Sequence, residues 1–153
     1  MNINTLTIKA QELLQSAMTL ARERSQQALE PQHILAAAIA DDDSLASFLI
    51  GRVGANVAML RRETDEAIAR LPRVEGGGEV YFSRESSAVV QRAVDLTRTF
   101  ADRFASVEHI VAALAKERSV ARDIMRGAGI TEESLVAAIK EFRKGATVDS
   151  ATE

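Results

Sequence analysis

A nine-residue stretch that occurs twice constrains the fold of this chain more than any other feature. The first copy spans residues 29–37 (LEPQHILAA) and the second spans residues 105–113 (ASVEHIVAA). His33 and His109 hold the same place in the two copies, and further matches continue along the chain on both sides. Self-similarity at a nearly fixed offset is the signature of a repeated structural unit. We therefore expect one unit that is duplicated in tandem.

The pattern of apolar residues predicts helices throughout. Apolar positions recur at the i, i+3, i+4 and i+7 spacing of amphipathic helices, and the chain has only two Pro and eight Gly. Residues that favour helix starts precede these patterns, including Thr7 and Ser83 as N-caps and Pro31 in a first turn. We predict an all-α fold of eight helices, built as two four-helix units related by an approximate two-fold axis. The predicted helices begin near residues 7, 31, 44, 56, 83, 106, 119 and 131.

Composition also suggests where the units begin and end. The first unit covers residues 1–71, and the connecting loop covers residues 72–82, which contain Pro72 and three consecutive glycines. The second unit covers residues 83–144. From residue 145 the composition becomes small and polar, so residues 145–153 are expected to begin a linker.

Several functional classes are disfavoured by composition. The absence of Cys excludes disulfides, thiolate metal sites and thiol catalysis. The two His provide too few ligands for a typical zinc site. The net charge is −3 without a block of Lys or Arg, so nucleic acid is not an expected partner. No apolar run has the length of a membrane span and no signal-peptide pattern opens the chain, so the expected location is the cytosol.

The candidate catalytic residues have simpler structural explanations. His33 and His109 each stand in the first turn of a predicted helix, and a duplicated structural role explains that symmetry. Neither a G-x-S-x-G nucleophile motif nor a phosphate-binding glycine loop is present. A hydrolase that uses either histidine is the weakest alternative, and we expect no enzymatic activity from this chain.

Binding through a surface is the better hypothesis. Two helical units leave a groove where they meet, and apolar grooves bind peptides. The stretch from residue 99 to 108 joins two predicted helices and places four notable residues close together in sequence: Asp102, Arg103, Phe104 and Glu108. A loop with a buried Phe and solvated charges is the structural alternative for this stretch.

Three motifs resemble the amino-terminal domain of the Clp ATPase chaperones, of which the duplicated Clp repeat is the hallmark. They lie at residues 7–12, 29–35 and 70–76. The join at residues 71–74 (LPRV) and the closing residues 146–150 are most similar to ClpB, the protein disaggregase branch. The resemblance covers essentially the whole chain. It implies a domain of a homohexameric AAA+ ATPase that threads aggregated polypeptides through its pore together with the DnaK system.

The resemblance also implies a role for this domain and its residues. The family domain engages unfolded or aggregated polypeptide, and its substrate-contact positions match Thr7, Asp102 and Glu108, with Phe104 beside them. The resemblance also implies a hydrophobic groove, but it does not identify the residues that line it. ATP and magnesium would serve the full-length protein, whereas this chain has no nucleotide motif and is expected to be a cofactor-free monomer. The alternative is an adaptor-docking domain of the ClpA or ClpC branch. His109 departs from the Leu that is common in the family.

Overall fold

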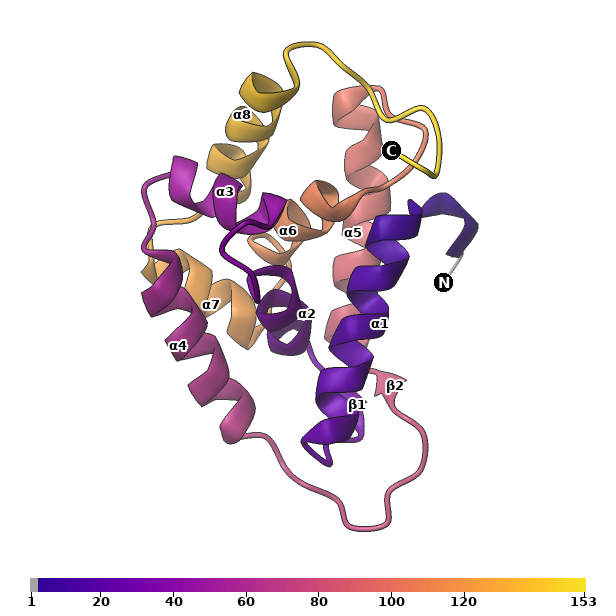
Figure 1. Cartoon of the computed structure of the whole chain (residues 1–153), viewed down its shortest axis with the longest axis vertical. Coiled ribbons are helices and arrows are strands. Elements are labelled where there is room, and N and C mark those ends of the chain that lie inside the picture. Colours follow the sequence, from indigo (N-terminus) through magenta and orange to yellow (C-terminus); the bar gives the residue numbers. More distant parts are fainter. Residues whose placement is uncertain (1–2) are drawn as a thin grey trace.

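The computed structural model describes residues 3–153, and these form eight α-helices, one short 3-10 helix and two two-residue strands (Figure 1). The prediction of an all-α fold with eight helices is confirmed. The elements in chain order are η1 (Ile3–Thr5), α1 (Ile8–Glu23), β1 (Ala28–Leu29), α2 (Pro31–Ala38), α3 (Leu45–Arg52), α4 (Val57–Ala69), β2 (Tyr81–Phe82), α5 (Arg84–Phe100), α6 (Val107–Leu114), α7 (Val120–Gly127) and α8 (Glu132–Arg143).

Side chains at the predicted N-caps fix the helix starts. The Oγ1 of Thr7 accepts the N–H of Ala10 at 3.1 Å, and the Oγ of Ser83 accepts the N–H of Ser86 at 3.1 Å. Such bonds satisfy donors that have no partner inside the helix. The same cap occurs at Ser44, Asn56, Ser119 and Thr131.

Reciprocal backbone pairing joins the two repeats. β1, which precedes α2, pairs in parallel with β2, which precedes α5. An isolated parallel bridge between Leu6, before α1, and Ala105, before α6, repeats this arrangement with the roles of the repeats exchanged. The exchange is what an approximate two-fold axis produces. The connecting loop was expected to extend through residue 82, but its last two residues form β2. Strands this short carry no periodic signal, and their partners are far away in sequence.

A single apolar core runs through both repeats. The repeated stretches form α2 and α6, which lie at the centre of the molecule between the longer helices (Figure 1). Ile34 and Ile110, at equivalent places in the two stretches, are fully buried in this core. The two units therefore share one interior. Among the residues that the structure describes, no helix is long and apolar enough to cross a membrane.

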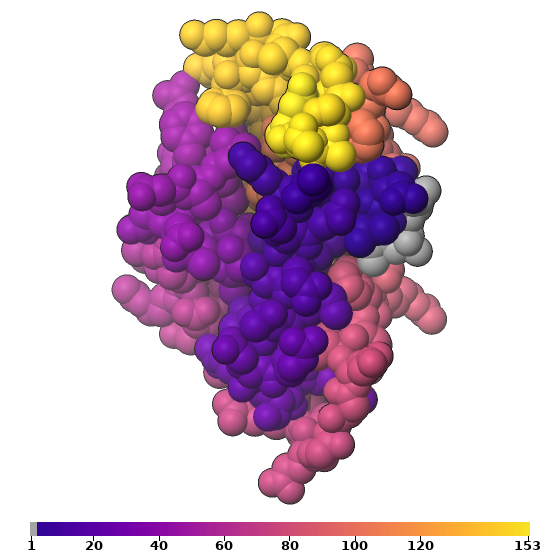
Figure 2. All heavy atoms as spheres, turned by 45° about the vertical axis from the view of Figure 1, so that its right-hand side comes forward, coloured from indigo at the N-terminus to yellow at the C-terminus, as the bar shows by residue number. Residues whose placement is uncertain are grey.

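The end of the chain folds back onto the domain. Residues 145–153 were expected from composition to begin a linker, yet Val148 is buried and the segment reaches the start of α1 (Figures 1 and 2). Its hydrogen bonds to the rest of the domain use its backbone groups, which composition cannot predict. The division of the chain into two repeats and a linker remains a prediction.

Candidate functional site

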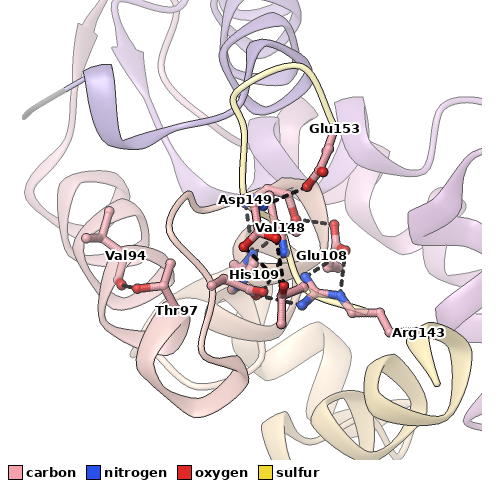
Figure 3. A network of polar contacts seen from close by, with 11 residues as sticks. Val94, Thr97, Glu108, His109, Arg143, Val148, Asp149 and Glu153 are labelled. Atoms are coloured by element: carbon pink, nitrogen blue, oxygen red, sulfur yellow. Dashed lines mark hydrogen bonds and ion pairs between the residues drawn. The ribbon is translucent and has the colours of Figure 1, made fainter. Parts of the chain in front are cut away.

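A buried polar network lies where the α5–α6 loop meets the end of α8 and the C-terminal segment (Figure 3). α5 ends at Phe100. Ala101 follows as its C-cap with a φ of 55° in the left-handed region, and the N–H of Asp102 closes the turn by donating to the Thr97 carbonyl at 2.8 Å. This turn points the Asp102 side chain into the protein, where it is fully buried. A buried carboxylate needs hydrogen-bond donors around it.

Asp102 receives donors from three parts of the chain. Its Oδ2 accepts the His109 Nε2–H at 2.7 Å and the Arg143 Nη1–H at 2.6 Å, and its Oδ1 accepts the Val148 N–H at 2.8 Å. These donors come from α6, α8 and the C-terminal segment. Asp102 thus links three elements that are distant in sequence.

Arg143 joins this carboxylate to a second one. Its Nη2 lies 3.0 Å from Oε2 of Glu108, and its side chain is only 7% exposed. The Ser106 hydroxyl donates a short hydrogen bond to the other oxygen of Glu108. Burial raises the pKa of Glu108, but hydrogen bonds from Ser106 and the backbone and the ion pair with Arg143 outweigh it, so the pKa is lowered. One cation thus holds two buried carboxylates.

The histidines hold the first turns of α2 and α6. Nδ1 of His109 accepts the Ser106 N–H at 2.8 Å, so the ring proton is on Nε2 and is donated to Asp102. Nδ1 of His33 likewise accepts the Glu30 N–H at 2.9 Å. Burial lowers the pKa of His33 to about 4, with a smaller contribution from the charge of Arg24. Burial also lowers the pKa of His109 against the opposing effect of Glu108 and Asp102. The expected structural role of both histidines is confirmed.

The structure brings the predicted site residues into one region but buries most of them. Thr7 is fully buried, and its N–H donates to the Ala105 carbonyl at 2.9 Å, which anchors α1 beside the loop. Asp102 and Glu108 meet at Arg143, and Phe104 between them is half-buried. Sequence reasoning missed Arg143, because a basic residue in the last turn of a helix is ordinarily a surface residue. Among residues 3–153, no group of three His, Asp or Glu side chains is arranged to hold a metal ion.

A groove between α5 and α8 adjoins this network. It consists of two neighbouring hollows of about 410 and 390 Å³ that share Thr99 and Lys140 in their walls. Phe100 and Arg143 line the first hollow, and the Arg143 guanidinium carbon lies 4.9 Å from the centre of the Phe100 ring. The second hollow is lined by Arg92, Leu96, Glu132, Glu133, Val136 and Ala137 as well as the shared pair.

Charged side chains border the apolar parts of this groove. Arg92 and Glu132 form a two-pronged ion pair with N–O distances of 2.6 and 2.9 Å. Lys140 lies 5.9 Å from the centre of the Phe100 ring, and no acidic residue lines the first hollow. A groove of this kind combines an apolar contact area with polar groups that orient a ligand.

Comparison with known proteins identifies the family. The family described as the Clp repeat (R) N-terminal domain matches residues 5–128. Curated relatives include the chaperone protein ClpB of Porphyromonas gingivalis, which is 44% identical over 98% of this chain, and that of Bacteroides thetaiotaomicron, which is 41% identical over the same share. The chain spans 17% of the length of each of these relatives.

Solved structures share the fold. The Hsp104 N-terminal domain from Candida albicans superposes with a TM-score of 0.83 at 23% identity, over 95% of this chain and 96% of that chain. The N-terminal domain of the E. coli ClpV1 ATPase gives a TM-score of 0.76 at 13% identity, over 97% and 90% of the two chains. At these identities the likeness concerns the fold alone. Because the family match spans most of the sequence, the chain belongs to the Clp repeat N-terminal domain family, the amino-terminal domains of Clp ATPases.

Proposed function

We propose that this domain captures exposed apolar segments of unfolded or aggregated polypeptides for a ClpB-like disaggregase. The observation that carries the proposal is the open groove between α5 and α8, where the partly exposed Val136 and the largely buried Leu96 and Phe100 line the walls between charged borders. Such a surface accepts many apolar sequences, because the hydrophobic effect is non-directional. The ClpB relatives at 44% and 41% identity support the choice of branch.

Weak binding suits such a role. A shallow groove with few polar anchors would bind apolar segments in the micromolar to millimolar range, about −8 to −4 kcal/mol. A segment held this loosely can be passed on to an ATPase pore. In this proposal the full-length protein is a homohexamer that uses ATP and magnesium and works with the DnaK system. The domain alone is a cofactor-free, non-catalytic monomer.

The predicted contact residues act in two ways under this proposal. Asp102 and Glu108 hold Arg143 above Phe100 and so shape one end of the groove. Thr7 fixes the start of α1 against the neighbouring loop through Ala105. Phe104, which is only half-buried, offers a direct apolar contact.

Binding of an unfolded protein tests the proposal. A reduced and carboxymethylated protein carrying a fluorescent label should bind the domain in anisotropy titrations, and the same protein in its native state should not. Val136→Asp places a charge in the groove and should weaken binding at least about fivefold. Val120→Asp is the matched control, because Val120 is 47% exposed on α7, away from the groove. Equal affinity for native and unfolded probes would contradict the proposal.

The alternative is docking of a folded adaptor, as in the ClpA and ClpC branches. The N-terminal domain of Arabidopsis thaliana ClpD shares the fold with a TM-score of 0.68 at 22% identity, which shows the fold alone. The same titration separates the two functions. An adaptor-docking domain would not bind the unfolded probe, and it would bind one folded protein in a pull-down.

A further inference from the structure

The end of the chain lies across the candidate site. Residues 146–149 leave α8 and pass the α5–α6 loop without regular structure, and residues 150–152 turn beside the start of α1 (Figures 1 and 2). Both backbone polar groups of Val148 are paired: its N–H donates to Asp102 Oδ1 at 2.8 Å, and its carbonyl accepts the Arg103 N–H at 2.9 Å. Farther along, the Ala151 carbonyl accepts the Ile8 N–H at 2.8 Å.

These contacts recognise backbone and hardly depend on sequence. The Ile8 N–H belongs to the first turn of α1 and has no acceptor within the helix, so any carbonyl placed there would satisfy it. Within residues 146–151, only Val148 is buried, with 7% of its surface exposed. A site that pairs with backbone groups and buries one aliphatic side chain places little demand on the sequence of its ligand. An unfolded polypeptide presents both features wherever an apolar segment is exposed.

We propose that residues 146–151 are a resident competitor. From Ala146, which lines the first hollow of the groove, they occupy a continuation of the groove in which an apolar segment of an unfolded polypeptide docks. The inference rests on the proposed function and gives it a mode of recognition. The incoming segment donates an N–H to Asp102, accepts the N–H groups of Arg103 and Ile8, and places a small aliphatic side chain where Val148 lies. The covering segment also explains why Asp102, a predicted contact residue, is buried.

The segment is attached by few contacts, as a displaceable competitor must be. Asp149, Thr152 and Glu153 are exposed, and three backbone hydrogen bonds and one buried valine connect residues 146–151 to Ile8, Asp102 and Arg103. While the segment is docked, the apparent affinity for a polypeptide falls in proportion to the fraction of molecules whose site is open. Releasing the segment should therefore tighten binding without any new contact.

Two aspartate substitutions in the full chain test this inference. Val148→Asp buries a second carboxylate beside Asp102 and should release the segment, and the affinity for the labelled unfolded protein should rise about tenfold. Thr152→Asp adds the same charge at the exposed position immediately after the segment and should leave the affinity unchanged within about twofold. Hydrogen exchange at the Ile8 and Arg103 amides should speed up in the first variant only, which reports release without any ligand. If Val148→Asp fails to fold, Val148→Gly removes the side chain alone and serves the same purpose.

A peptide added in trans provides the second measurement. A synthetic peptide with the sequence of residues 145–153 should compete with the unfolded protein on the Val148→Asp domain and slow exchange of the Arg103 amide again. The same peptide carrying Val148→Asp should do neither. Unchanged polypeptide affinity despite faster exchange at Ile8 and Arg103 would overturn the competitor and leave the capture function standing. If neither the original domain nor Val148→Asp binds unfolded protein, the capture function itself is overturned, and this inference with it.

Discussion

At the residue scale, the two repeats satisfy the same buried histidine in chemically different ways. His33 Nε2 lies 2.7 Å from the Gln26 amide oxygen, and the amide nitrogen of Gln26 donates to the Ile68 carbonyl at 2.7 Å. In the second repeat Asp102 stands where Gln26 stands in the first, and its charge requires a cation. Arg143 supplies that cation at 2.6 Å. Duplication therefore kept the position of each histidine, while one repeat has a neutral network and the other an ionic one.

The neutral network makes stability depend on pH. The pKa of His33 is about 4 in the folded protein against 6.5 in an unfolded chain, so the unfolded state binds more protons between these values. The resulting stabilisation is complete above pH 6.5 and is lost as the pH falls towards 4. Between pH 7 and pH 5 this loss should amount to about 1 to 2 kcal/mol, the lower figure allowing for solvent screening.

Urea unfolding of the original protein and of His33→Gln at the two pH values measures this contribution. The glutamine variant should show a smaller loss of unfolding free energy, because its side chain does not titrate. Comparing the two proteins cancels the carboxylates that titrate in the same range. Identical pH dependence in both would show that His33 takes up its proton equally in the folded and unfolded states.

The ionic network should be sensitive to loss of its cation. Arg143→Met leaves Asp102 and Glu108 buried without a counter-charge, which should cost about 3 kcal/mol of unfolding free energy. Arg52→Met is the matched control: Arg52 pairs with Glu141 at 2.6 Å, but its side chain is 52% exposed, and its loss should cost less than about 1 kcal/mol.

Denaturant midpoints of the two arginine variants provide the measurement. Adding Asp102→Asn to Arg143→Met should recover part of the lost stability, since it removes one of the uncompensated charges. Equal costs for Arg143→Met and Arg52→Met would mean that solvent screens the network despite its burial in the structure.

At the scale of elements, local sequence signals predicted the helix starts well. Contacts between segments that are distant in sequence could not be predicted in this way. The helix starts at Thr7, Ser44 and Asn56 follow from a capping residue next to an apolar stripe, and both signals lie within a few residues of each other. β1 and β2 are two residues each, and their pairing depends on segments that the sequence keeps far apart. No sequence pattern within either strand predicts that it pairs with the other.

The candidate site likewise contains some residues that were predicted from the sequence and others that were not. Asp102 and Glu108 were found through resemblance to a family and through their position in a loop. Arg143, which holds them, and Val148, which covers one of them, lie about 40 residues farther along the chain and were not found. A basic side chain in a final helical turn and a valine in a polar tail are common surface features. Only the tertiary fold reveals that they complete the site.

At the scale of the whole molecule, the duplication does not produce two independent domains. The core cluster includes Ile34 of the first repeat and Ile110 of the second without interruption. Ser83 donates its N–H to the Leu29 carbonyl at 3.0 Å, and its Oγ caps α5, so the start of the second repeat is built on the first. Thr7 and Ala105 make the reciprocal connection. Neither repeat has a complete interior of its own.

This shared core predicts that the domain unfolds in one cooperative step. Ile34→Val and Ile110→Val remove one methylene from equivalent buried positions of the two repeats, and each should cost about 1 kcal/mol. Both variants should shift the same single transition, monitored by circular dichroism and by the fluorescence of Tyr81, without a plateau. A fragment of residues 1–71 should remain unfolded in buffer, because it lacks the residues that cover its apolar face. Two separate transitions, each moved by only one of the substitutions, would show that the repeats fold independently and that their pairing adds little to stability.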